Sequence, residues 1–299
     1  MNRYFSLALS LLLLLLLATS CKDEPKNEGE GSGSTAPNAN NRPSISLQIG
    51  ADTARWRDTL VSAIEPSDLP GADSSKLARI SFAYPLIDAT PNATALKDSI
   101  NALIRRNLLL SDNGMIAYES LQQRMNDFLD EYIAQRDEMA EIYRSMGVDI
   151  LDLPRWSCEV QVRVVLNTSH FLVLQFDETN FTGGAHANVT TRFFNFDLHT
   201  GELLAIDQLF KDKSSYYAQL QPLVERNMRQ HLRSLGVENL ELEIDQGAFA
   251  RIPEHFALTR TGLRFSLDPY EVGAFSMGTL QFEVPYEELY YLLDREKVR

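Results

Sequence analysis

The chain has 299 residues, of which 44% are apolar and 9% are aromatic, and its formal net charge is −13 at pH 7. This length and apolar content can build one large domain or two small ones around a sizeable core. A surface this acidic, in a sequence without a basic stripe, argues against nucleic acid as a partner and would attract basic proteins or cations.

The N-terminal segment ends in a cysteine that stands directly after an apolar run. The run covers residues 5–18, Arg3 precedes it, and the small residues 18–20 lie just before Cys21. It is too short for an ordinary membrane-spanning helix. Residues 1–20 resemble a bacterial lipoprotein signal peptide, after which the cysteine is acylated and becomes the mature N-terminus. The resemblance implies that Cys21 carries fatty acids such as palmitate and holds the protein on a membrane.

The residues after this cysteine predict a flexible tether and a location on the outer membrane. Glu, Asn, Gly, Ser and Pro dominate residues 21–43, a composition typical of a flexible linker. Lys22-Asp23-Glu24 resembles the tag that sends Bacteroidetes lipoproteins to the outer face of the outer membrane. The alternative is a plain linker on a lipoprotein that faces the periplasm. The sequence offers no second hydrophobic span, so we expect anchoring through lipid alone.

In the first half of the folded region, the apolar spacing predicts two strands followed by two helices. Period-two alternation indicates strands at residues 44–49 and 78–84, the second ended by Pro85. Three- and four-residue spacing predicts a helix at residues 95–109 and a long amphipathic helix at 117–146, which Gly147 would end.

The second half alternates mainly with period two. We expect an antiparallel pair with one solvent-facing side, then a further strand and turn, a helix that ends at Gly236, and three short strands. In chain order these are residues 156–166, 171–176, 188–197, 199–202, 215–235, 255–259, 263–267 and 279–284. Strands and helices in blocks predict an α+β fold with antiparallel sheets packed against helices.

Cys158 is the single thiol of the mature chain after Cys21. It has no partner for an internal disulfide. Its place in an alternating strand pattern predicts a buried, inert thiol rather than a nucleophile.

Four segments in order resemble one family: residues 181–186, 196–203, 268–272 and 278–286. Together they are similar to the RsiV-like C-terminal domain of unknown function, which forms the extracellular part of a lysozyme-sensing membrane anti-sigma factor. The stretches 80–86 and 96–109 resemble the PdaC-type domain of a peptidoglycan deacetylase. The resemblance implies a PdaC-type domain at 44–155, with the long helix, and an RsiV-like domain at 156–299.

Departures from these families limit what the resemblance implies. The anti-sigma relatives have a cytoplasmic sigma-binding segment and a spanning helix, and the deacetylase relatives have a metal-dependent catalytic domain; we find none of these in the sequence. Many relatives read Ala-Pro-Tyr-Ala where this chain has Gly273-Ala274-Phe275-Ser276. The loss of a proline and a tyrosine hydroxyl weakens the expectation of lysozyme binding.

Two loops hold the candidate ligand-binding residues. Gly183 and Gly184 allow unusual backbone angles, and His186 follows them; we expect it to be structural or hydrogen-bonding rather than catalytic. The histidines show no metal-ligand spacing, so no metal or cofactor is expected. The second loop places exposed-capable aromatic side chains between strands, which suits a protein interface, although these rings could equally fold onto the core. Its candidate residues are Pro269, Tyr270 and Phe275.

These observations predict a non-enzymatic envelope lipoprotein that binds a protein or cell-wall glycan, such as a basic, lysozyme-like muramidase. One alternative is a peptidoglycan-modifying enzyme that uses His186 or unrecognised carboxylates, for which the sequence offers many candidates: Asp177, Glu178, Asp207, Glu241, Glu243 and Asp245. Another alternative is a structural component of an outer-membrane complex.

Overall fold

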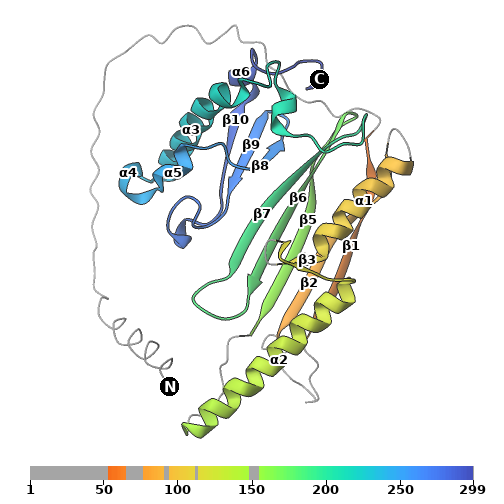
Figure 1. Ribbon diagram of the computed structural model, residues 1–299, viewed down its shortest axis with the longest axis vertical. Helices are drawn as coiled ribbons and strands as arrows, with labels where there is room; N and C mark the ends of the chain where they lie inside the picture. The colour runs from red at the N-terminus through yellow and green to blue at the C-terminus, as the bar shows by residue number, and fades with distance from the viewer. Residues whose placement is uncertain (1–52, 65–76, 91–93, 112–113, 148–154, 299) are drawn as a thin grey trace, which may run out of the picture. The chain divides into compact units, whose positions relative to one another are not determined.

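The computed structural model describes residues 53–64, 77–90, 94–111, 114–147 and 155–298 (Figure 1). The strands are β1 (Arg55–Ile64), β2 (Arg79–Ala89), β3 (Leu110–Ser111), β4 (Ile116–Ala117), β5 (Ser157–Asn167), β6 (Phe171–Phe181), β7 (Asn188–Asp197), β8 (His255–Leu258), β9 (Gly262–Leu267) and β10 (Leu280–Pro285). The longer helices are α1 (Thr94–Leu108), α2 (Leu121–Ser145) and α3 (Tyr216–Ser234). Short helical turns are η3 (Ile206–Leu209), α4 (Leu240–Glu243), α5 (Gln246–Phe249), η4 (Phe275–Met277) and α6 (Tyr286–Leu289).

A five-stranded sheet in the order β1-β2-β5-β6-β7 and a three-stranded sheet in the order β10-β9-β8 form the framework. Only the β2–β5 pair is parallel among the pairs within these two sheets, and β3 with β4 adds a small antiparallel hairpin. The expected α+β class with antiparallel sheets and helices is confirmed. The expected domain division at residue 155 falls between β2 and β5, which are neighbours in one sheet.

Two hydrophobic cores share the five-stranded sheet. Residues of α1 and α2 pack with Phe82, Leu172 and Leu174 in one core, while α3 and the strands β8 to β10 pack with Phe171 and Val173 in the other. The two sets in β6 alternate, because successive side chains of a strand point to opposite faces. The expectation of one solvent-facing side is therefore wrong for the first half of β6, where Phe171 to Phe176 are all buried.

The structure corrects several expected element bounds. β2 runs through Pro85, which pairs with Asp58 of β1. The β2–β5 pairing has already ended at Ala83, so the missing N–H of proline removes no hydrogen bond between β2 and β5. α2 begins at Leu121 rather than at residue 117, because Ser120 caps it by accepting a hydrogen bond from the Gln123 amide at 3.1 Å.

The strand expected at 44–49 and the leader and tether at 1–43 lie outside the described residues. β1, which the sequence pattern did not indicate, lies at the edge of the sheet and is mostly exposed. Within the described part of the chain, no helix is both long enough and apolar enough to span a bilayer.

Candidate functional site

The β6–β7 hairpin loop carries the first group of predicted residues. Gly183 and Gly184 have φ angles of +96° and +100°, a region that side-chain-bearing residues rarely occupy. A Cβ atom at either glycine would meet nothing within 4 Å, so backbone conformation rather than space requires glycine here. The predicted backbone freedom is thus used, and it brings the chain around to His186.

The connection between β9 and β10 begins with a tight turn over residues 268–271. The Glu271 amide donates to the Asp268 carbonyl at 3.0 Å, and the Asp268 amide donates to the Glu271 carboxylate at 2.8 Å. Tyr270 has a φ of 71°, the one positive φ outside glycine in the described ranges. Proline followed by a residue with positive φ is the arrangement of a type II turn. Pro269 and Tyr270 therefore define the turn that projects the tyrosine side chain.

The two loops meet in a cluster of three rings, His186, Tyr270 and Phe275, which we term the aromatic cluster. The rings of His186 and Phe275 stack with centroids 3.7 Å apart and planes 11° from parallel. The Tyr270 hydroxyl lies 2.5 Å from His186 Nε2. Tyr270 remains 62% exposed, whereas Phe275 and His186 are half-buried. Of the two candidate rings in this loop, Tyr270 faces solvent, whereas Phe275 stacks on His186.

The imidazole of His186 has unused hydrogen-bonding capacity. Its Nδ1 is buried and has no hydrogen-bond partner among the described residues. Because its Nε2 is paired with Tyr270, the ring is held at one nitrogen while the other is unsatisfied. This arrangement fits the hydrogen-bonding role that the sequence predicts for His186. In the part of the chain that the structure describes, no three His, Cys, Asp or Glu side chains gather as metal ligands would.

Two carboxylates, one of them two residues before Tyr270, are bridged by Thr191. The Thr191 amide donates to Asp268 at 2.9 Å, and its hydroxyl donates to Asp177 at 3.0 Å. Arg163 and Gln175 also donate to Asp177, at 2.5 and 2.9 Å. Burial raises the pKa of Asp268 to about 6, against the lowering effect of the Thr191 hydrogen bond. Asp177 was among the predicted carboxylates, but nothing in the sequence paired it with Asp268.

A buried ion pair on the opposite face of the sheet was not predicted. Arg124 of α2 is 2% exposed and donates to the Glu178 carboxylate at 2.6 Å. It also donates to the carbonyls of Leu108 and Leu110 at 2.8 and 2.7 Å, where α1 ends. The signal available in the sequence is the position of Arg124 between Leu121 and Met125, on the apolar stripe of the helix. Cys158, 2% exposed, lies beside this pair, so its predicted burial is confirmed.

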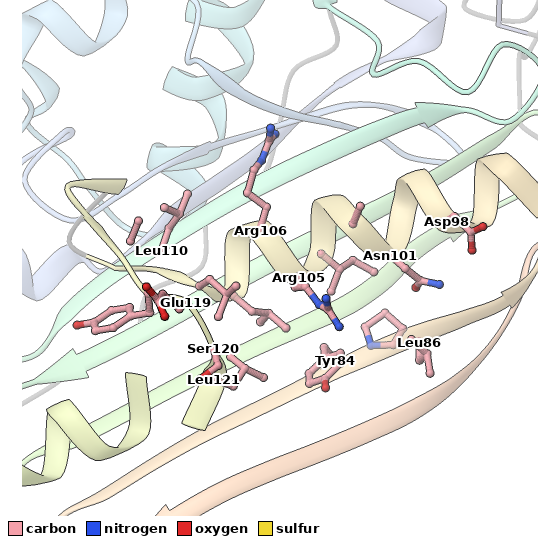
Figure 2. A pocket seen from close by; sticks show the side chains of 17 residues that line it. Tyr84, Leu86, Asp98, Asn101, Arg105, Arg106, Leu110, Glu119, Ser120 and Leu121 are labelled. Carbon is pink, nitrogen blue, oxygen red and sulfur yellow. The ribbon is translucent and has the colours of Figure 1, made fainter. Parts of the chain in front are cut away.

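A large groove of about 870 Å³ runs along α1 between β2 and the start of α2 (Figure 2). Asn101 fixes one wall, because its side chain bonds the backbone N–H and carbonyl of Ile87 at 2.9 and 2.8 Å. Figure 2 shows Tyr84 and Leu86 of β2 below the helix, with Asp98 and Arg105 on the helix above them. The groove combines an apolar floor with charged side chains at its rim, as a site for an amphipathic molecule would.

Two segments of the chain match known protein families. Residues 72–189 match the family described as deacetylase PdaC, and residues 207–287 match a family described as a protein of unknown function, DUF3298. The chain thus matches a PdaC-type family model over one segment and a DUF3298 family model over the next. His186 lies in the first match, whereas Tyr270 and Phe275 lie in the second. The aromatic cluster is therefore built from both matched segments.

The similar proteins include one curated relative and two crystal structures. Peptidoglycan-N-acetylmuramic acid deacetylase PdaC of Bacillus subtilis (strain 168) is 22% identical over 119 residues, which cover 40% of this chain but only 25% of that protein. A DUF3298 family member from Bacteroides fragilis NCTC 9343 is 20% identical with a TM-score of 0.63, and one from Pseudomonas aeruginosa PAO1 is 16% identical with a TM-score of 0.56. Each covers 81% of this chain and 95% of the other. These structures share the fold.

Proposed function

We propose that the protein is a lipoprotein of the cell envelope that binds a basic muramidase of the lysozyme type without transforming it. The lipid on Cys21 would hold the protein on the outer membrane, at the cell surface or on the periplasmic face. The lipoprotein-like leader and the PdaC-type domain, whose curated relative is named a peptidoglycan deacetylase, support a place next to the cell wall. The resemblance of the C-terminal half to the RsiV-like domain supports a muramidase as the ligand.

The observation that carries this proposal is the aromatic cluster. Tyrosine residues are enriched at the energetic centres of protein interfaces, because they bury a large apolar area and present a hydroxyl. Tyr270 is 62% exposed, yet its turn, its hydrogen bond to His186 and the stack beneath it hold it in place. A side chain that is ordered before binding loses less conformational entropy when the partner arrives.

Charge supports a basic partner. The chain carries 41 acidic and 28 basic residues, and a complementary positive ligand would be steered toward such a surface. Association should therefore slow as the salt concentration rises, because salt screens attraction between exposed charges.

Calorimetric titration of the detergent-solubilised protein with hen lysozyme tests the proposal. We expect saturable heat with the wild type and binding that is about 30-fold weaker for Tyr270→Ala, the size of a loss of about 2 kcal/mol at an interface hot spot. Tyr291→Ala is the matched control, because Tyr291 is also a solvent-exposed tyrosine, 78% exposed, and lies outside the aromatic cluster. Wild-type protein that gives no heat, or equal losses in both variants, would contradict the proposal.

A peptidoglycan-modifying enzyme is the second candidate. The observation that favours it is the pair Asp177 and Asp268, held on Thr191, in which the pKa of Asp268 is raised by burial to about 6. A carboxyl with such a pKa can donate or accept a proton near neutral pH. Release of acetate or reducing sugar from purified peptidoglycan, lost on Asp268→Asn and kept in Thr179→Ala, would favour this function over binding.

A further inference from the structure

A second, smaller cavity lies within the PdaC-type match, between α2 and the adjoining ends of β5, β6 and β7. Its volume is about 190 Å³. The residues that line it come from seven segments: Ile80, Ser111, Ile116, Tyr118, Arg124, Phe128, Glu131, Trp156, Cys158, Asn180, Thr182 and Asn188. A volume of this size is several times the ~30 Å³ share of one water and below the ~300 Å³ at which sites for drug-sized ligands begin. It suits one small ring.

The cavity has a polar row on the sheet side. Cys158, Asn180 and Asn188 are directly opposite one another on β5, β6 and β7, so their side chains share one face of the sheet. Asn180 Oδ1 is buried and has no hydrogen-bond partner within the described residues. A buried acceptor without a donor costs free energy, which a ligand that supplies an N–H or O–H group would recover.

Aromatic rings from α2 and from the residue before β5 line another part of the cavity. Trp156 and Phe128 lie with ring centroids 5.7 Å apart, and Trp156 also contacts Tyr132 at 5.8 Å. Flat apolar surfaces of this kind accept the C–H face of a ring through dispersion and hydrophobic contact. The cavity thus offers a polar edge and an apolar face to the same small molecule.

The buried charge at the cavity is already balanced. The guanidinium of Arg124 is paired with Glu178 at 2.6 Å and also donates to the carbonyls of Leu108 and Leu110. A second buried charge brought in by a ligand would meet no free counter-charge from this group and would carry its full desolvation cost. The chemistry therefore favours a neutral ligand over a phosphate or a carboxylate.

From the aromatic face, the unsatisfied acceptor and the paired charge, we infer that this cavity binds one neutral sugar ring of a glycan, with its apolar face against Trp156 and a hydroxyl or acetamido N–H on Asn180. This site goes beyond the proposed function. It uses other residues than the aromatic cluster and takes another class of ligand.

Trp156 provides a direct readout. The chain has two tryptophans, and Trp56→Phe leaves Trp156 as the single reporter at the cavity. Titration of this variant with N-acetylglucosamine and its disaccharide should give a saturable change in tryptophan emission in the millimolar range. In the same background, Asn180→Leu should weaken binding about tenfold, as the loss of one hydrogen bond predicts. Thr179→Ala is the control, because Thr179 is the exposed neighbour on the opposite face of β6.

Two further measurements keep the result interpretable. Thermal unfolding checks that Asn180→Leu is folded. If Asn180→Leu does not fold, Ser111→Ala, also at the cavity, tests the site independently. Tyr270→Ala should leave sugar binding unchanged, which separates this inference from the proposed muramidase site. An emission that does not respond to either sugar, or that responds equally in Asn180→Leu and Thr179→Ala, would overturn the inference.

Discussion

Replacing Arg124 by methionine should destabilise the protein more than any change at a surface ion pair. The substitution keeps the unbranched side chain that packs beside Phe82, over whose ring the guanidinium lies at 5.1 Å, but removes the charge. It removes the cation that donates to the Glu178 carboxylate, which is 13% exposed, and it takes the same donor away from two carbonyls at the end of α1. Buried charges without a partner are costly, whereas exposed ones are hydrated.

The expected magnitude follows from this geometry. Breaking a buried ion pair by removing one partner costs about 3–5 kcal/mol, so we expect the melting temperature to fall by about 6–20 °C for a folded region of roughly 150–250 residues. Arg124→Met/Glu178→Leu should be more stable than Arg124→Met alone, because the second substitution removes the unpaired charge. Any loss of stability that remains in the double variant would measure the cost of removing the Arg124 hydrogen bonds to the carbonyls of Leu108 and Leu110.

Thermal and urea unfolding of the three variants measure these effects. Arg57→Met is the matched control, because Arg57 pairs with Asp88 at 3.8 Å with both side chains exposed, and we expect it to change the free energy of unfolding by no more than about 1 kcal/mol. Equal shifts for Arg124→Met and Arg57→Met would refute the claim that burial makes this ion pair important.

Three further predictions follow from other parts of the molecule. Asp268 has a folded pKa of about 6, above the ~3.9 of an unfolded chain, so its favourable contribution is present below about pH 4 and lost as the pH rises through 6. Asp268→Asn should therefore raise the melting temperature at pH 7 but not at pH 4. His255, whose pKa is lowered by burial, has the opposite effect on stability, but comparison with the wild type at each pH cancels it. A difference in melting temperature that does not depend on pH would contradict the assignment. Gly262→Ala should lower the melting temperature strongly, since its Cβ would lie 2.3 Å from the Val284 carbonyl oxygen. Gly236→Ala, with open space around it, should cost only the ~1–2 kcal/mol of a left-handed backbone. Similar losses in the two variants would argue against the close approach of β9 and β10. Cys21→Ser should abolish incorporation of labelled palmitate, and label retained in that variant would disprove the lipid anchor.

Much of the fold was predictable because the strongest signals are local. The helices at α1 and α3 match residues 95–109 and 215–235 within one residue at each end, since their apolar faces repeat at helical spacing. β7 begins and ends as its alternation predicts. β1 escaped prediction because an edge strand that is mostly exposed carries little apolar alternation. Its existence depends on pairing with β2, which local sequence does not reveal.

The candidate site was predictable in parts and not as a whole. The glycines and the Pro-Tyr turn mark their loops by residue type alone. That His186 meets Tyr270, 84 positions later in the chain, follows only from how the two sheets pack. Arg124 could be placed on the apolar stripe of its helix, but its partner Glu178 lies 54 positions away on a strand, β6. Residue types predict which side chains are able to bind or react, and tertiary contacts decide which of them act together.

The burial of β6 explains why the two matched segments pack into one compact unit. Leu172 and Leu174 pack with α1 and α2, whereas Phe171 and Val173 pack with α3 and the second sheet, so each core depends on the same strand. Removing either layer would expose one apolar face of β6, at roughly 25 cal/mol for each Å² uncovered. The hairpin that β6 forms with β7 also carries Thr182 of the small cavity and His186 of the aromatic cluster. Both candidate sites are therefore positioned by a strand that neither matched segment could bury alone.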